Sequence, residues 1–309
     1  MNKKLAILFF AQIILWFACA KDDPKPDSGL KGSYLGQTPP GNTPVRFIPD
    51  NNYKSTANWW WQSSPVFSPS GEEMYFTKRI ASEGVEQIWF TRIENGVWSI
   101  PQKAYFANSG MDKCMMFLSN NDTMYFCNYS EGTFIYRVTR NSNGWSQPQG
   151  VEVPMPENYI GISYSIARNK NIYLAMMHKV SNNFMTNYAT CDIYVSKYIN
   201  GSYTQPENLG SVNSNEGECV DFIDPEERFI IISSRRAGGY GYHDLYISRR
   251  NPDGTWHTPV NLGPNINTSN EESSATISPD GMYMFFVTQR YGDIEYTPYW
   301  VSSSILEAH

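Results

Sequence analysis

Carboxylate side chains recur at one kind of position in this sequence, just ahead of a short apolar run. Glu216 and Glu218 precede one such run, Glu271 and Glu272 precede another, and Asp112 precedes a third. Carboxylates can hydrogen-bond hydroxyl groups, hold a cation, or act as general acid and base. If the protein is an enzyme, the candidate catalytic residues are Glu216, Glu218, Glu271 and Asp112.

Aromatic side chains occupy the same kind of position ahead of other apolar runs. Trp59, Trp60 and Trp61 are consecutive, and Tyr159 stands alone. Flat aromatic faces suit sugar rings and peptide side chains, so the pattern predicts a site with an aromatic side and an acidic side. The alternative is that the Trp run packs in the core and that the carboxylates are solvated loop residues. The residues expected to bind a ligand are Trp59, Trp60, Trp61, Tyr159, Glu216, Glu271, Glu272 and Arg236.

Other catalytic signatures are missing from the sequence. The histidines are His178, His243, His257 and His309. Because each is isolated, their spacing indicates neither a His-rich metal site nor a Ser-His-Asp triad, and we expect no metal and no cofactor. We expect His243 to have a structural role in its loop, and Arg235 or Arg236 to form a salt bridge with Asp244.

Repeated turn sequences indicate the elements that would position these residues. They are Asn95-Gly96, Asn143-Gly144, Asn200-Gly201 and Asp253-Gly254, at intervals of 48, 57 and 53 residues. Both residues of a type I′ turn need positive φ, which Asn, Asp and Gly tolerate best, so each pair predicts a tight β-hairpin. The interval slightly exceeds the roughly 40 to 50 residues of a propeller blade. The sequence therefore predicts a β-propeller with some long loops.

Apolar runs between these turns supply the remaining strands. Five inner strands end in turns such as Phe67-Ser68-Pro69-Ser70-Gly71, and each is followed by a second and a third strand. Residues 43–52 match residues 258–267, the fourth strand of a blade. The N-terminal segment is thus expected to complete the C-terminal blade, which would remove exposed sheet edges. We predict an all-β propeller of five four-stranded blades, or six if residues 153–191 hide an irregular blade.

The predicted connections indicate which face of the propeller carries the site. The fourth-to-first and second-to-third connections share one face, here called the long-loop face, and the other turns share the short-turn face. The long connections are residues 107–112, 153–160, 177–190, 211–217, 235–243 and 264–273. Because long irregular loops usually carry binding residues, we expect the ligand at the channel mouth on the long-loop face.

Several of these segments resemble the PD40 family, the WD40-like repeats also found in the propeller of the translocation protein TolB. Residues 277–281 and 67–71 match the family's signature turn, the second with Ser70 in place of the usual Asp. Residues 233–246 resemble its Arg-Gly-Gly-to-Asp-aromatic loop, and residues 34–41 resemble the opening segment of secreted members. The resemblance, from Tyr34 to the end, implies a scaffold rather than a chemistry, because propellers host lectins, hydrolases, lyases and docking modules.

The N-terminal residues predict export. Two lysines precede an apolar run over residues 5–17, and Ala18 and Cys19 follow this run. A membrane span needs about 20 apolar residues, whereas a basic start, a shorter apolar centre and a small residue before the cut are typical of a secretory signal. We predict a signal peptide over residues 1–18 and cleavage before Cys19.

The same segment resembles a bacterial lipoprotein signal, which implies a lipid on Cys19; the alternative is ordinary secretion with an incidental Cys19. Residues 19–32 are too polar to bury and predict a flexible tether, before a single propeller domain over residues 33–309. Lys21-Asp22-Asp23 resembles the acidic signal that sends lipoproteins to the surface of some Gram-negative bacteria. We expect an outer-membrane protein, exposed at the cell surface if this signal acts.

The net charge restricts the classes of partner that we expect, and the cysteine spacing indicates whether disulfides form. The formal net charge of −6 argues against nucleic acid and against an anionic membrane surface, since both select basic patches. We expect a monomer whose partner is a glycan, peptide or protein of the cell envelope. Besides Cys19, the cysteines are Cys114, Cys127, Cys191 and Cys219. Their spacing is unpaired, which favours buried free thiols over a disulfide framework.

Two functions fit these observations. The first is a surface lipoprotein whose propeller binds a glycan, peptide or partner protein without chemistry. The second is a carbohydrate-active enzyme, a glycoside hydrolase or lyase, with a pair of carboxylates at the channel. Binding is favoured because the acidic residues fall on the loops of only some blades.

Overall fold

The computed structural model describes residues 28–106, 112–117, 123–128, 134–142, 144–178, 191–290, 292–293 and 295–309, with the backbone alone for 112–117. The predicted signal peptide, Cys19 and most of the predicted tether lie outside these residues. So do the side chain of Asp112, residues 107–111 of the 107–112 connection, and residues 179–190 of the 177–190 connection.

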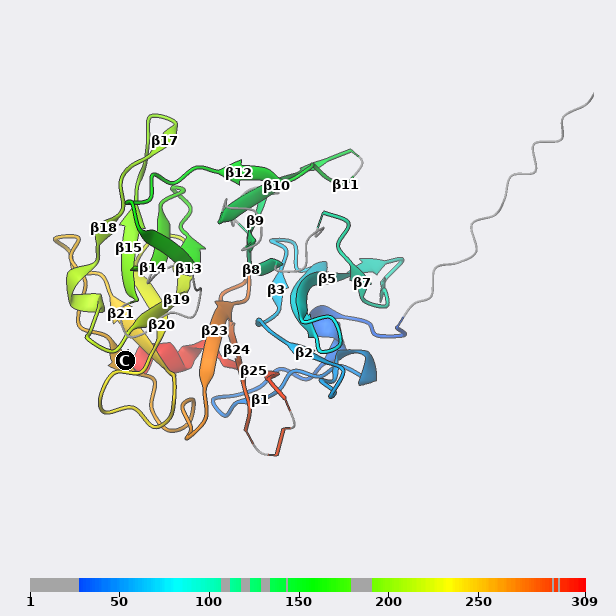
Figure 1. Cartoon of the computed structure of the whole chain (residues 1–309). Coiled ribbons are helices and arrows are strands. Elements are labelled where there is room, and N and C mark those ends of the chain that lie inside the picture. Colours follow the sequence, from blue (N-terminus) through cyan, green and yellow to red (C-terminus); the bar gives the residue numbers. More distant parts are fainter. Residues whose placement is uncertain are drawn as a thin grey trace, which may run out of the picture.

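Five antiparallel sheets follow one another around a ring (Figure 1), which confirms the all-β, five-bladed propeller. The first blade contains β2 (Trp59–Trp61), β3 (Val66–Phe67), β4 (Glu73–Ile80), β5 (Val85–Glu94), β6 (Val97–Trp98) and β7 (Gln102–Lys103). The second contains β8 (Asp112–Phe117), β9 (Thr123–Asn128), β10 (Ile135–Asn141), β11 (Gly144–Trp145) and β12 (Gln149–Val151). The third contains β13 (Tyr159–Ile166), β14 (Ile172–His178), β15 (Asp192–Ser196) and β18 (Glu207–Asn208), beside the ribbon of β16 (Tyr198–Ile199) and β17 (Ser202–Tyr203).

The last two blades are the most regular. The fourth contains β19 (Glu218–Ile223), β20 (Phe229–Ser234), β21 (Asp244–Arg249) and β22 (Val260–Asn261). The fifth contains β23 (Glu272–Ile277), β24 (Tyr283–Thr288), β25 (Thr297–Ser302) and β1 (Val45–Arg46). Short 3-10 helices lie at η1 (Ser33–Gly36), η2 (Asn51–Tyr53), η4 (Gly210–Val212) and η5 (Ser303–Ala308).

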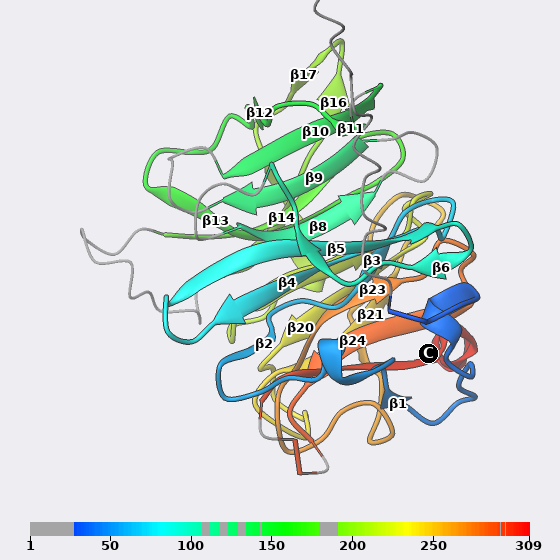
Figure 2. The ribbon, with the colours of Figure 1, turned by 90° about the vertical axis from the view of Figure 1, so that its right-hand side faces the viewer.

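The ring closes as the sequence predicts. In β1, Val45 pairs with Trp300 and Arg46 with Tyr299 of β25, and Figure 2 shows this N-terminal strand beside the C-terminal blade. Phe47, which follows β1, is fully buried, and its ring lies 5.3 Å from that of Trp300. The closing strand is therefore held by ladder hydrogen bonds and by aromatic packing.

The N-terminal segment before β1 runs along the first and last blades. The Ser28 N–H donates to the Trp98 carbonyl at 2.9 Å, next to the β5–β6 hairpin. Farther on, the Tyr34 hydroxyl donates to Asp280, in the β23–β24 turn, at 2.6 Å. Both contacts involve turns of the short-turn face, so the chain enters the propeller on that side.

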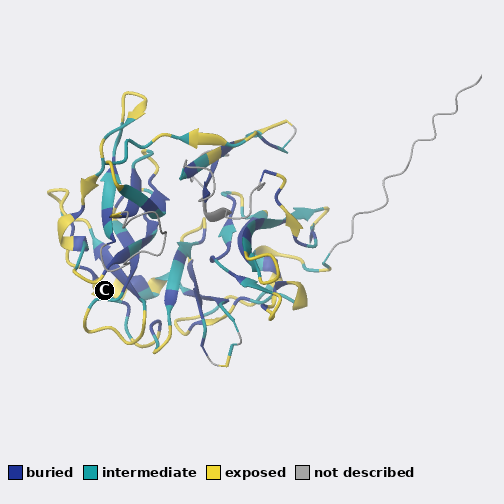
Figure 3. Cartoon of the chain, in the orientation of Figure 1, coloured by how far each residue is buried: buried dark blue, intermediate teal, exposed yellow. Residues whose placement is uncertain are grey.

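The second strand of each blade is buried on both sides, because blades pack face to face. Every residue of β24 and six of the seven in β14 are buried, which Figure 3 shows as dark strands inside the ring. Their sequences are accordingly continuous apolar runs rather than alternating ones. The buried second strands hold in place the neighbouring first strand of each blade, which lines the channel.

Three of the four predicted hairpins form, and one differs. Asn95 and Asn200 have φ of 54° and 51°, as a type I′ turn requires. β10 also pairs with β11, but there Gly144 stands opposite Asn141 in the ladder instead of in the turn, and Asn143 lies outside the described residues. The prediction of a tight hairpin at Asp253 is wrong: a longer turn closes at the bridge between Arg250 and Trp256. The Asp253 carboxylate accepts from the Thr255 N–H and hydroxyl, which stabilises that wider turn.

Candidate functional site

Two of the predicted acidic residues hold loops in place. The Glu218 carboxylate accepts from the Ser214 N–H and hydroxyl, from Ser234, and from Arg236 at 3.1 Å. Both Glu218 and Arg236 are largely or wholly buried. Because every oxygen of Glu218 is engaged, this residue fastens the β18–β19 connection to β20, and its chemistry is structural.

The next blade repeats this arrangement residue by residue. Glu272 accepts from the Thr268 N–H and hydroxyl, from Thr288, and from Arg290 at 3.3 Å. Glu272 and Arg290 are both buried. We call the two sets the loop latches: Ser214, Glu218, Ser234 and Arg236 in one blade, and Thr268, Glu272, Thr288 and Arg290 in the next.

The expected salt bridge of Asp244 with Arg235 or Arg236 is wrong. Asp244 instead accepts from the N–H groups of Tyr240 and Gly241, at 2.6 and 3.0 Å, and from the Asn261 amide. Backbone donors of the tight glycine-rich loop thus satisfy this carboxylate, which leaves Arg236 for the loop latch.

The Trp run divides between core and surface. Trp61 is fully buried, stacks on Phe76, and donates its indole N–H to the Tyr53 carbonyl. Trp59 and Trp60 are half-buried. The Lys78 ammonium lies 3.9 Å from the Trp59 ring centroid and 4.2 Å from that of Trp89. Lys78 therefore covers one face of Trp59 and leaves less of it for a ligand.

The remaining predicted residues are dispersed. Glu216 is exposed on the β18–β19 connection, and Tyr159 is half-buried with its ring 4.0 Å from that of His178. Among the predicted ligand-binding and catalytic residues whose side chains the structure describes, Glu271 is the one that lies in a group of interacting polar side chains from several loops of the long-loop face.

This group, which we call the mouth cluster, consists of Asp221, Arg235, Tyr242, His243, Glu271 and Tyr296. The Tyr296 hydroxyl donates to Glu271 at 3.0 Å, and His243 Nδ1 lies 3.6 Å from Glu271 Oε2. Arg235 donates to His243 Nε2 at 3.0 Å and stacks on Tyr242, at 3.7 Å from its ring centroid. Since Nε2 accepts this bond, the proton of a neutral His243 resides on Nδ1 and faces Glu271.

Backbone contacts hold the mouth cluster together. The Tyr242 N–H donates to the Asn270 carbonyl at 3.0 Å, and the Glu272 N–H donates to the His243 carbonyl at 2.8 Å. These bonds join the β20–β21 loop to the β22–β23 connection. The side chains are thereby fixed by two adjacent blades.

Asp221 adds a second carboxylate to the cluster. It sits where the register between β19 and β20 shifts, between Val220 and Phe222, and this bulge frees its side chain from the regular alternation. Its Oδ1 accepts from the Ser274 N–H in the adjacent blade at 2.9 Å, whereas Oδ2 is buried without a hydrogen-bond partner among the described residues.

The two carboxylates differ in acidity. Burial raises the pKa of Asp221 to about 8, against the opposing hydrogen bond from the Ser274 N–H, and the charge of Glu271 adds to the rise. Burial also acts to raise the pKa of Glu271, but the interactions with His243 and Tyr296 outweigh it and lower that pKa. Near neutral pH the site therefore combines a protonated acid with an ionised carboxylate.

Sequence reasoning missed most of this cluster. Asp221 is a polar residue inside an apolar strand, which is a detectable signal. Its position in a bulge, however, follows only from strand register. His243 and Arg235 were assigned structural roles, and their approach to Glu271 depends on two loops meeting across blades.

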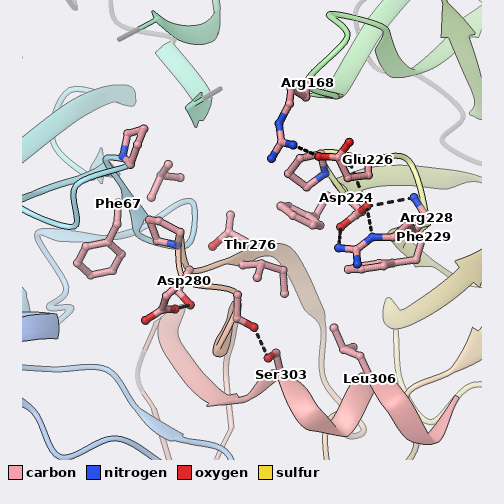
Figure 4. Close-up of a pocket in the computed structure, with 18 of the residues that line it drawn as sticks. Phe67, Arg168, Asp224, Glu226, Arg228, Phe229, Thr276, Asp280, Ser303 and Leu306 are labelled. Atoms are coloured by element: carbon pink, nitrogen blue, oxygen red, sulfur yellow. Dashed lines mark hydrogen bonds and ion pairs between the residues drawn. The ribbon is translucent and has the colours of Figure 1, made fainter. Parts of the chain in front are cut away.

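A hollow of about 640 Å³ opens at the other end of the channel, on the short-turn face (Figure 4). Its apolar lining includes Phe67, Phe222, Phe229 and three turn prolines. Four of its charged residues form ion pairs: Arg168 with Glu226, and Arg228 with Asp224 at 2.6 Å. These pairs tie the turns together, so the long-loop face has the more reactive arrangement.

Two further findings concern the described residues as a whole. No group of three or more His, Cys, Asp or Glu side chains within them is placed to hold a metal ion. Within the same part of the chain, no helix has the length and apolar character needed to cross a membrane.

Comparison with known proteins gives distant structural likenesses only. No protein-family model and no curated protein matches the sequence. A putative TolB from Agrobacterium tumefaciens is similar with a TM-score of 0.49 and 15% identity, over 78% of this chain and 76% of that one. TolB from Acinetobacter baumannii has a TM-score of 0.45 and 16% identity, and the match covers 77% of this chain but only about half, 53%, of that protein.

A post-proline cleaving enzyme from Rickettsia typhi is also similar, with a TM-score of 0.37 and 11% identity over 74% of this chain and 32% of that one. The solved structures thus include both TolB proteins and a peptidase. Because no family model matches, the resemblance to PD40 repeats stays a prediction from the sequence motifs.

Proposed function

We propose that the protein is a binding module that holds a glycan at the mouth cluster. The observation that carries this proposal is the convergence of Glu271, His243 and Arg235 beside exposed tyrosines. Tyr240 and Tyr242 are 49% and 55% exposed and belong to the same loop. Aromatic faces next to fixed hydrogen-bonding groups suit a sugar ring, which presents apolar C–H faces and hydroxyls together.

The test compares variants on a glycan array, with a peptide array as the second arm. Tyr242→Ala and Glu271→Gln are expected to weaken binding at least tenfold, since each removes a contact of about 1.4 kcal/mol or more. Met282→Ala is the matched control, because Met282 is 55% exposed but lies beside the β23–β24 turn on the short-turn face. Glycan binding that both variants leave intact would contradict the proposal, and binding on the peptide array alone would replace the glycan by a peptide.

Catalysis is the second candidate function, and the opposed acidities of Asp221 and Glu271 favour it. A glycoside hydrolase needs one protonated and one ionised carboxylate, and the mouth cluster supplies both at neutral pH. Release of reducing ends from any bound polysaccharide that is lost in both Asp221→Asn and Glu271→Gln would establish an enzyme. Undiminished release by Asp221→Asn would exclude Asp221 as the acid.

We also propose that the chain is exported and anchored to the outer membrane through a lipid on Cys19. The basic start, the short apolar run and the Ala18-Cys19 pair support this location. The envelope setting is consistent with a glycan ligand.

A further inference from the structure

Two cysteines that are far apart in the sequence meet between the third and fourth blades. Cys191 lies just before β15 and is buried, and Cys219 lies in β19 and is half-buried. The Glu218 N–H donates to the Cys191 carbonyl at 2.8 Å, so the residue next to Cys219 is hydrogen-bonded to Cys191. The side chains are neighbours as well, because Cys219 is the largest influence on the pKa of the Cys191 thiol, which it raises.

We propose that Cys191 and Cys219 form a reversible disulfide that joins the third blade to the fourth. The geometry supports it, since the backbone hydrogen bond from Glu218 to Cys191 holds the two cysteine-bearing segments side by side, and a disulfide needs the two Cα atoms within about 7 Å. The site also lies beside functional elements: Cys219 directly follows Glu218 of a loop latch and is two residues from Asp221 of the mouth cluster.

The exposure of the two thiols sets the order of the reaction. The Cys219 thiolate, which is the more accessible, attacks a small disulfide such as oxidised glutathione and forms a mixed disulfide, releasing one glutathione thiol. The Cys191 thiolate then displaces the second glutathione and forms the Cys191–Cys219 bond. The two cysteines lose two electrons and two protons in total, and the oxidant disulfide takes up both electrons.

Burial makes Cys191 unsuited to the first step. The neighbouring Cys219 and burial both raise the pKa of the Cys191 thiol, and the nearby carboxylates of Glu218 and Asp192 add to the effect. A protonated thiol is a poor nucleophile. Cys191 therefore reacts second, once the mixed disulfide on Cys219 lies next to it.

Peptide mapping of the wild-type chain tests the proposal without any variant. Trypsin separates the cysteines into residues 180–197 and residues 198–228, each with a single cysteine. After treatment with oxidised glutathione and digestion without reductant, we expect these two peptides to be linked and to separate on reduction. Free, alkylated peptides would overturn the proposal, as would a link from either one to Cys114 or Cys127.

Single substitutions test the order of reaction. Cys191→Ser is expected to accumulate glutathione on Cys219, because the resolving thiol is gone, whereas Cys219→Ser is expected to leave Cys191 unmodified. Cys127→Ser, which removes another buried thiol, is the matched control and should still form the link. In the wild type, oxidation should raise Tm by about 5 °C or more, since the bond closes a loop between adjacent blades. Glutathione on Cys191 in the Cys219→Ser variant would refute the proposed order.

Discussion

At the scale of single residues, Asp221 combines a buried carboxylate oxygen with a raised pKa. A carboxylate oxygen buried without a hydrogen-bond partner is costly when ionised, and Asp221 Oδ2 is in this position. The raised pKa means that the folded protein keeps the proton over a pH range in which the unfolded chain has released it. Asp221 thus links stability to pH.

We predict that this group makes the protein less stable as pH rises. The unfolded carboxyl ionises near pH 3.9, whereas the folded one ionises at about 8. The folded state therefore binds more protons between these values, and the free energy of unfolding falls by a few kcal/mol from about pH 4 to about pH 8. Asp221→Asn should remove this loss, so that the variant is more stable than the wild type at about pH 8 and similar to it at about pH 4. Denaturant unfolding at the two pH values measures the difference, and equal pH profiles would contradict the prediction.

The sequence could identify the right kinds of residue but not their partners. The pattern predicts carboxylates at the beginning of the inner strands: Glu218 and Glu272 are the first residues of β19 and β23, and Glu271 directly precedes β23. Whether such a carboxylate can contact a ligand depends on neighbouring residues from other loops. Glu218 and Glu272 are hydrogen-bonded within the loop latches, whereas Glu271 belongs to the mouth cluster. Trp59 and Trp61, two residues apart, lie on the same side of β2, yet Trp61 is fully buried against Phe76, whereas Trp59 is half-buried beneath Lys78.

At the scale of elements, the loop latches explain how irregular loops are held at fixed positions. In each loop latch, a buried carboxylate and a largely buried Arg join the loop before a first strand to the end of a second strand. The repeated sequence pattern is Asn-Ser or Asn-Thr, then a Glu four residues after the hydroxyl residue. The Asn side chains take part too: Asn267 bonds both backbone groups of Leu245.

We predict that Glu272→Gln destabilises the protein by about 3 kcal/mol, because it leaves the buried guanidinium of Arg290 without its counter-charge. Urea unfolding followed by tryptophan fluorescence measures the loss. Glu216→Gln serves as the control: Glu216 is exposed, and the change should stay within about 0.5 kcal/mol. A Glu272→Gln variant as stable as this control would mean that the latch contributes nothing.

The elements themselves were largely predictable, because local rules set them. Asn-Gly pairs specify type I′ turns through positive φ, and continuous apolar runs specify strands buried on both sides. The exception, Asp253-Gly254, follows Pro252, and its side chain builds a wider turn. The inner-strand bulges had no sequence signal, since register is decided by the packing of neighbouring blades.

At the scale of the whole molecule, ring closure was predictable because β1 repeats the sequence of a fourth strand. The meeting of Cys191 with Cys219 was not, since it depends on the angle between two blades. The proposal that the protein is attached to the membrane is based on the N-terminal residues alone.

We predict that Cys19→Ser moves the protein from the membrane fraction to the soluble fraction, because the substitution removes the sulfur that would carry the lipid. Cell fractionation with immunoblotting measures the shift. Cys127→Ser, which changes a buried cysteine of the propeller, should leave the protein with the membranes. A Cys19→Ser protein that still sediments with membranes would refute lipidation at this residue.

The place where the chain enters the propeller determines which end of the channel can meet a distant ligand. Ser28 is fixed beside Trp98, next to a turn of the short-turn face. Residues 19–27 number nine and reach at most about 30 Å when fully extended. A protein lipidated at Cys19 therefore keeps its short-turn side within that distance of the bilayer and directs the mouth cluster away from it, toward polymers and cells beyond the membrane.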